Sequence, residues 1–134
     1  MTADKRALIP GEAEDAVSAL NLSPGLLSGD FVFVTGMTGS APDGTMPKDP
    51  ATQFRNAFAK IAEVLREAGL TFDAVVDMTS YHVGLKDHFD LFAEIRATFV
   101  TDPYPAWTAV EVAGLRREGA LVEIKIIATT KPLG

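Results

Sequence analysis

The 134 residues predict one domain, spanning residues 1–134, and a composition of 47% hydrophobic and 22% charged residues indicates a folded core rather than a disordered chain. The absence of cysteine excludes disulfides, thiolate nucleophiles and cysteine-ligated metals, and the net charge of −6 disfavours nucleic acid as a partner, because such a binder must neutralise phosphates. No apolar run has the length of a membrane span or of a signal peptide, so we expect no membrane partner and a cytoplasmic location.

The first half of the chain predicts one strand and one long helix. Residues 13–20, between two turn signals, fit a short strand or a loop. The β-branched and aromatic run at residues 31–35 predicts a buried strand, and the Gly, Ser, Thr and Pro residues at 36–48 predict a loop. An Asp-Pro pair then predicts a helix over residues 49–69, with apolar residues three and four apart and a glycine as its stop signal.

The second half predicts a strand at residues 74–83, followed by a helix that Asp87 caps and the prolines at 102–105 end. Two strands follow, at residues 107–112 and 121–129, and the glycine-containing turn between them predicts an antiparallel hairpin. This order of elements predicts an α+β fold in which a single mixed β-sheet carries two helices on one face.

Two helices on one face leave the other face of the sheet uncovered. The strands have further apolar residues at alternate positions, which would form a large exposed apolar patch in a monomer. We assign to this open face Val75, Val83, Val110, Val112, Ile124 and Ile126. Burial in a symmetric oligomer is the simplest arrangement that removes such a patch from water, so we expect an oligomer.

The two histidines, His82 and His88, are the first candidates for chemistry. The sequence has no HExxH motif, no His-x-His pair and no dense carboxylate cluster, so we expect no metal site and no cofactor. A hydrogen-bonded strand histidine is the favoured interpretation of His82, with a ligand or acid–base role as the alternative. We expect His88 at the surface and no His–His pair of the kind that an RNA-cleaving site needs.

Glu123 is the most suggestive acid, because it lies in an apolar strand and carboxylates are rarely buried. It either forms an ion pair with Lys125, two residues on and on the same strand face, or orients a water or a substrate in a cleft between subunits. Thr35, at the end of a buried strand, either offers its hydroxyl to a ligand or bonds to the backbone. The spacing alone leaves both pairs of alternatives open.

Four strings support a family assignment: residues 29–36 (GDFVFVTG), the helix containing residues 53–70, residues 104–115 (YPAWTAVEVAGL) and residues 122–128 (VEIKIIA). With them, the chain resembles the RidA/YjgF family over nearly its whole length, and the string Pro-Ala-x-x-x-Val-Glu-Val is the most specific. The resemblance implies a chorismate-mutase-like fold and a homotrimer whose sheets form a central barrel. It also implies a cleft for a small-molecule ligand at each subunit boundary.

The resemblance further implies hydrolysis of reactive imines and enamines, which yields keto acids and ammonia. The glutamate that helps to place water in the family corresponds to Glu123, which is therefore the expected catalytic residue. The family's strand-end hydroxyl and glycine correspond to Thr35 and Gly36. Where family members have an arginine that clamps the substrate carboxylate, directly after Pro-Ala, this chain has Trp107.

Two further positions depart from the family pattern, because its N-terminal tyrosine falls on Leu22 and its helix asparagine falls near Phe92. The expected substrate-binding residues are Thr35, Gly36, Trp107, Ala109, Leu22 and Phe92. Tryptophan presents one N–H and an apolar plane in place of a bidentate guanidinium, so we expect a flatter or more apolar substrate than a small 2-iminoacid. A non-catalytic metabolite-binding trimer is the alternative function, and an endoribonuclease is the least favoured.

Overall fold

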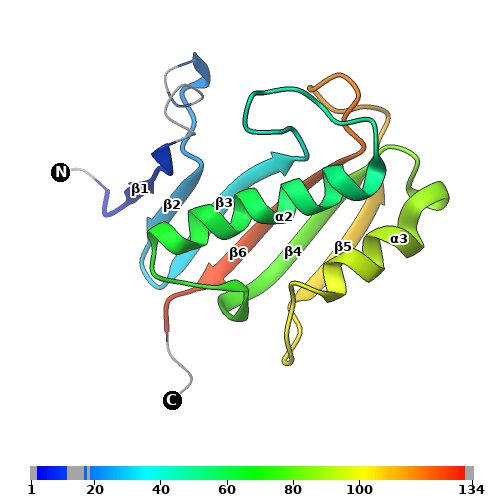
Figure 1. The fold of residues 1–134 in the computed structure, drawn as a ribbon. Coiled ribbons are helices and arrows are strands. Elements are labelled where there is room, and N and C mark those ends of the chain that lie inside the picture. The colour runs from blue at the N-terminus through cyan, green and yellow to red at the C-terminus, as the bar shows by residue number, and fades with distance from the viewer. Residues whose placement is uncertain (1–2, 12–16, 18, 132–134) are drawn as a thin grey trace.

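The computed structural model describes residues 3–11, 17 and 19–131 (Figure 1). Among these residues, six strands form one mixed sheet in the order β1-β2-β3-β6-β4-β5. Helices α2 (Pro50–Glu67) and α3 (Leu85–Ala97) both lie on the same face of this sheet, which confirms the predicted α+β arrangement. The strands are β1 (Arg6–Leu8), β2 (Gly25–Ser28), β3 (Phe31–Thr38), β4 (Val75–His82), β5 (Ala106–Glu111) and β6 (Val122–Thr129), and a 3-10 turn, η2 (Phe72–Ala74), precedes β4.

The N-terminal part adds two strands that the sequence patterns did not predict. β1 pairs antiparallel with β2, and β2 pairs antiparallel with β3, so both extend the sheet at the β3 side. β3 itself continues to Thr38, three residues beyond its predicted end and into the predicted loop, because Met37 and Thr38 still pair with β6. Most of the predicted segment 13–20 lies outside the described residues.

The long helix is confirmed, and its capping follows the predicted chemistry. Asp49 is the N-cap, where its Oδ2 accepts a hydrogen bond from the Thr52 backbone N–H at 3.0 Å, and Pro50 opens the first turn. The helix ends at Glu67, and Gly69 has a φ of +72°, a left-handed conformation that glycine adopts without a Cβ clash.

The N-cap of helix α3 lies three residues before the predicted cap, Asp87. The N-cap is Gly84, which has a φ of +79° and makes no side-chain capping bond. The free backbone N–H groups of Gly84 and Leu85 instead donate to the carboxylate of Glu111, at 3.0 and 2.6 Å. Because Glu111 ends a strand more than twenty-five residues further along the chain, the local sequence contains no sign of this cap.

The predicted hairpin between the last two strands is wrong. β5 pairs parallel with β4 at the sheet edge, whereas β6 lies between β3 and β4 and is antiparallel to both. A parallel pair needs a crossover, and α3 provides it between β4 and β5. The turn after β5 therefore returns the chain to the centre of the sheet instead of joining neighbours.

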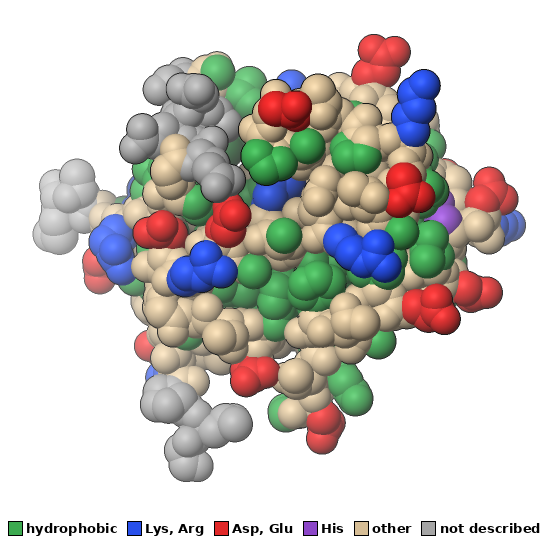
Figure 2. All heavy atoms as spheres, viewed as in Figure 1, with side chains coloured by type: hydrophobic (Ala, Val, Ile, Leu, Met, Phe, Trp, Pro, Cys, Tyr) green, Lys and Arg blue, Asp and Glu red, His purple; other side chains and the backbone are tan. Residues whose placement is uncertain are grey.

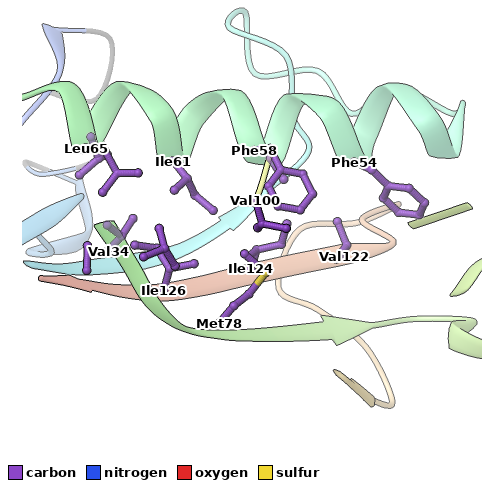
Figure 3. Close-up of a cluster of buried hydrophobic side chains, with 14 of the residues drawn as sticks. Val34, Phe54, Phe58, Ile61, Leu65, Met78, Val100, Val122, Ile124 and Ile126 are labelled. Atoms are coloured by element: carbon purple, nitrogen blue, oxygen red, sulfur yellow. The ribbon is translucent and has the colours of Figure 1, made fainter. Parts of the chain in front are cut away.

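The core lies between α2 and the sheet (Figure 3). Phe54, Phe58, Ile61 and Leu65 point from α2 toward side chains of β3, β4 and β6, and all four are fully buried. The strand side chains that face them include Val34, Met78, Val122, Ile124 and Ile126. The assignment of Val75, Ile124 and Ile126 to the open face is therefore wrong, because all three belong to the buried core. Along β6 burial alternates, and the even-numbered residues face the helices.

The open face nevertheless has apolar side chains, at other positions. Phe31 and Phe33 of β3 are 45% and 40% exposed, and they pair across the sheet with Thr129 and Ile127 of β6. Val76 of β4 is 41% exposed. The expected oligomer stays a prediction, with Phe31, Phe33 and Val76 as the apolar residues that it would bury. No described helix combines the length and the apolar character that a membrane crossing requires.

Candidate active site

A cavity of about 560 Å³ lies at the end of β3, bordered by residues 20–24, the loop after β3 and the outer side of α2. It contains four of the residues predicted for the site, namely Leu22, Thr35, Gly36 and Glu123. None of the predicted residues Trp107, Ala109 and Phe92 lines this cavity. Within one subunit, the structure therefore separates the predicted site into two groups.

Gly36 is the residue that makes room for the Glu123 carboxylate. The β3–β6 register shifts between Val34 and Met37, so the backbone at Gly36 lies directly against the Glu123 side chain. A Cβ at position 36 would overlap the carboxylate and come within 2.8 Å of Cδ of Glu123. Contacts this short cannot be accommodated without movement, so a side chain at position 36 would displace the acid from the cavity.

The structure shows which contacts Glu123 and Thr35 make, the two residues for which the sequence left alternatives open. Glu123 and Lys125, both within the described residues, form no ion pair with each other; the carboxylate lies at Gly36, and Lys125 is exposed. The Thr35 hydroxyl donates to the Ser23 carbonyl oxygen at 2.9 Å, so it is bonded to the backbone. This bond ties β3 to the segment that carries Leu22 on the cavity wall.

Lys60 is a cavity residue that the helical periodicity did not single out. Periodicity placed it on the solvent side of α2, but the loop after β3 folds over that side, and the Lys60 ammonium donates to the Ser40 hydroxyl at 2.9 Å. Burial, together with the nearby charge of Arg117, lowers the pKa of Lys60 to about 8, while Glu63 acts in the opposite direction. No local sequence signal distinguishes Lys60 from the other polar residues of this helix.

The second group of predicted residues lies under α3. Trp107 donates its indole N–H to the Ser80 hydroxyl at 2.9 Å. Its ring stacks on Phe89, with centroids 5.5 Å apart, and the Arg96 guanidinium carbon lies 4.0 Å from the ring centre. Phe89 and Arg96 are seven residues, or about two turns, apart on the same side of the helix, and both contact the indole ring. Much of the apolar plane is therefore covered within the subunit.

The other two members of this group lie beside Trp107. Phe92 is fully buried, with its ring centroid 6.0 Å from that of Trp107. Ala109 pairs with Ser80 in the parallel β4–β5 ladder and faces the same side of the sheet as Trp107. Trp107, Phe92 and Ala109 thus form one cluster under α3, which we call the α3 cluster.

His82 belongs to the core beside the α3 cluster, as the favoured interpretation predicted. It is fully buried, and its Nε2 lies 2.8 Å from the Ser80 hydroxyl. His88 is half-buried, with its ring against Phe54. The expectation of no His–His pair is wrong, because the strand-to-helix turn brings His88 Nε2 within 3.4 Å of His82 Nδ1. Burial, with a smaller effect of His88, lowers the pKa of His82 to about 4. Among the described residues, no three potential metal ligands gather.

Comparison with known proteins gives the family. A family model described as endoribonuclease L-PSP matches residues 13–130, which is most of the chain. A solved structure from Mycobacterium tuberculosis, a member of the YjgF/YER057c/UK114 family, superposes with a TM-score of 0.80 at 30% identity and covers 93% of this chain and 98% of its own. The chain belongs to the RidA/YjgF family.

Two further members of the RidA/YjgF family are similar to this chain. The RutC family protein YjgH of Escherichia coli is 37% identical over 93% of this chain and 95% of its own length. A solved structure of YjgH superposes with a TM-score of 0.86 over 98% of this chain and all of that one. The 2-iminobutanoate/2-iminopropanoate deaminase of Mus musculus is 31% identical over 75% of each chain.

Proposed function

We propose that this RidA/YjgF protein hydrolyses the C=N bond of an imine or enamine in the cavity at Glu123, acting on a substrate other than a small 2-iminoacid. The observation that carries the proposal is the Glu123 carboxylate, which lies over Gly36 in a cavity of about 560 Å³. The deaminase activity named for the mouse relative supports this reaction class. No cofactor or metal is part of the proposal.

Glu123 would act as a general base. A water adds to the imine carbon while the carboxylate accepts one of its protons. That proton then passes to the nitrogen, the carbonyl group forms, and ammonia leaves, so one water is consumed for each imine. Gly36 keeps the carboxylate in the cavity, and Thr35 and Leu22 form part of the wall that excludes bulk water.

Trp107 argues for a substrate outside the small 2-iminoacids. The family resemblance places a carboxylate-clamping arginine at this position, and the chain is proposed to belong to a branch that lacks it. The indole N–H already donates to Ser80, so Trp107 offers no replacement for a bidentate guanidinium. Recognition at the α3 cluster would then rest on apolar contact with Trp107 and Ala109, while Phe92, which is fully buried within the subunit, would support the Trp107 ring.

Replacing Glu123 with glutamine is expected to lower kcat for imine hydrolysis by about 10²–10⁴-fold, because the amide keeps the shape of the side chain but cannot accept the water proton. The assay would follow ammonia release from imines generated in place, comparing small 2-iminoacids with imines that have larger apolar substituents. Glu67→Gln, at an exposed position at the end of α2, is the matched control and is expected to keep wild-type activity. Equal rates for wild type, Glu123→Gln and buffer would overturn the proposal.

A homotrimer is proposed as the assembly that completes the site. The cavity and the α3 cluster are separate within one subunit, so only a neighbouring subunit can bring one group against the other. Replacing Phe33 with glutamate, on the open face at 40% exposure, is expected to yield a folded monomer without activity. Light scattering checks this: a wild-type mass near 14.3 kDa at micromolar concentration would contradict the assembly.

The alternative functions make different predictions. A non-catalytic metabolite-binding trimer would show ligand-dependent changes in the fluorescence of Trp107, the single tryptophan, with no turnover. RNA cleavage, which the description of the family model names, is disfavoured by the burial of Ser80 and His82, which cannot reach a phosphodiester. On the face shown in Figure 2, basic side chains are interspersed with acidic ones rather than gathered into a stripe.

A further inference from the structure

Lys60 places a primary amine in the wall of the cavity, where the hydrolysis proposed above does not use it. The side chain leaves α2 and runs under the loop that follows β3, and its Nζ donates to the Ser40 hydroxyl at 2.9 Å. Ser40 is itself buried at 8% exposure, so its oxygen is a fixed acceptor. The amine is therefore held at one point of the cavity instead of sampling solvent.

The charged groups around Lys60 have both signs. The positive charge of Arg117 lowers the pKa of Lys60, and the negative charge of Glu63 raises it. Asp43, Arg116 and Glu123 also line the cavity. Cations and carboxylates are thus mixed around the amine, and the surroundings do not form a specific anion site. The described apolar wall residues include Leu20, Leu22, Pro24 and Val64. A ligand with an apolar substituent fits such a wall better than a small anion does.

The electrostatics leave part of Lys60 uncharged at neutral pH. With its pKa lowered to about 8, Lys60 is a free amine in about a tenth of the molecules at pH 7. An ordinary lysine is uncharged in fewer than one molecule in a thousand at this pH. The neutral amine can still donate one N–H to Ser40 while its lone pair is available to the cavity. Position and lone pair are the two requirements for a nucleophilic lysine.

We infer that Lys60 is a carbonyl-reactive amine, which forms a Schiff base with an aldehyde or ketone that has an apolar substituent. The nitrogen lone pair attacks the carbonyl carbon, and the new C=N bond forms as the carbonyl oxygen leaves as water with the two hydrogens of the amine. The reaction needs no oxidant or reductant and is reversed by water. It requires Lys60 and Ser40 but not the proton transfer at Glu123, so it goes beyond the proposed function.

Reductive trapping tests the inference. The folded protein is treated at pH 7 with limiting 2-methylpropanal and sodium cyanoborohydride, which reduces the C=N bond to a stable secondary amine. Peptide mapping then follows each of the six lysines and separates the N-terminal amine, whose ordinary pKa is also near 8. Lys60 is expected to be alkylated at least tenfold faster than the exposed Lys48 and Lys86. Its rate should level off above pH 8, whereas theirs should continue to rise.

Three comparisons test whether Lys60 is the reactive amine, whether the reaction is independent of Glu123, and whether the site prefers an apolar aldehyde. Lys60→Arg, which keeps a cation and N–H donors, should lose the fast alkylation, and Glu123→Gln should keep it, so failure at Glu123 is distinguishable from failure at Lys60. Glyoxylate replaces the apolar aldehyde by an anionic one; preferential trapping of glyoxylate would overturn the apolar ligand class. Alkylation of Lys60 no faster than that of Lys48 and Lys86 would overturn the inference, and wild-type mapping alone measures this.

Discussion

Replacing Phe58 with alanine is expected to lower the free energy of unfolding by about 3–5 kcal/mol, the range for removing a buried aromatic ring. Phe58 is fully buried at the centre of the core, where its ring stacks on Phe99 at 4.7 Å between centroids and contacts Phe92 and Phe72 at 5.6 and 6.0 Å. Because these rings come from α2, α3 and the segments beside them, the cavity left by alanine cannot be closed by one small movement.

Urea denaturation followed by circular dichroism, at one fixed protein concentration, measures this loss. Phe89→Ala is the matched control, because Phe89 is 37% exposed and stacks on Trp107 at the edge of the core. Its removal is expected to cost less than about 1.5 kcal/mol. Equal losses for the two variants would contradict the placement of Phe58 at the centre of the core.

Acidification from pH 6.5 to pH 4 is expected to remove about 2–3 kcal/mol of stability through His82 alone. Its folded pKa of about 4 lies below the ordinary value of 6.5, so over this interval the unfolded chain binds a proton that the folded chain excludes. Stability is therefore complete above pH 6.5 and declines as the pH falls toward 4. Burial is the main cause, His88 acts in the same direction, and Glu111 acts against it.

His82→Gln isolates this contribution, because glutamine stays neutral and retains an amide that can bond to Ser80. The variant should lose stability less steeply than the wild type between pH 6.5 and 4, when both are measured by urea denaturation at several pH values. His88→Gln serves as the comparison at the partner position, since burial also lowers the pKa of His88. Identical slopes for wild type and His82→Gln would show that His82 is not the acid-sensitive group.

Local patterns determined most of the secondary structure. The Asp-Pro start and the apolar spacing predicted α2, and the alternating apolar residues predicted β4 and β6 within one or two residues of their ends. Such predictions succeed because capping and burial periodicity depend on neighbours within a few residues. Local patterns did not predict that Glu111 caps α3, because its two hydrogen bonds join residues far apart in the chain.

Strand order and the faces of the sheet were decided by tertiary structure. Two strands separated by a short turn favour a hairpin locally, but the crossover through α3 pairs β5 with β4 and leaves the central position to β6. The face that each strand residue takes then follows from register, and a shift of one residue exchanges the two faces. Ile124 and Ile126 are therefore buried under α2, although their sequence spacing fits either face.

The candidate site shows the same division. The sequence by itself determined the residue types, with an acid in an apolar strand at Glu123 and a glycine at position 36, and the family resemblance linked them. Only the tertiary structure decided that these two residues touch, that Lys60 joins them in one cavity, and that Trp107 lies elsewhere under α3. The physical reason is that side-chain period and capping act over one turn or one pleat, whereas a cavity is formed by segments whose separation in space depends on the packing of the whole sheet.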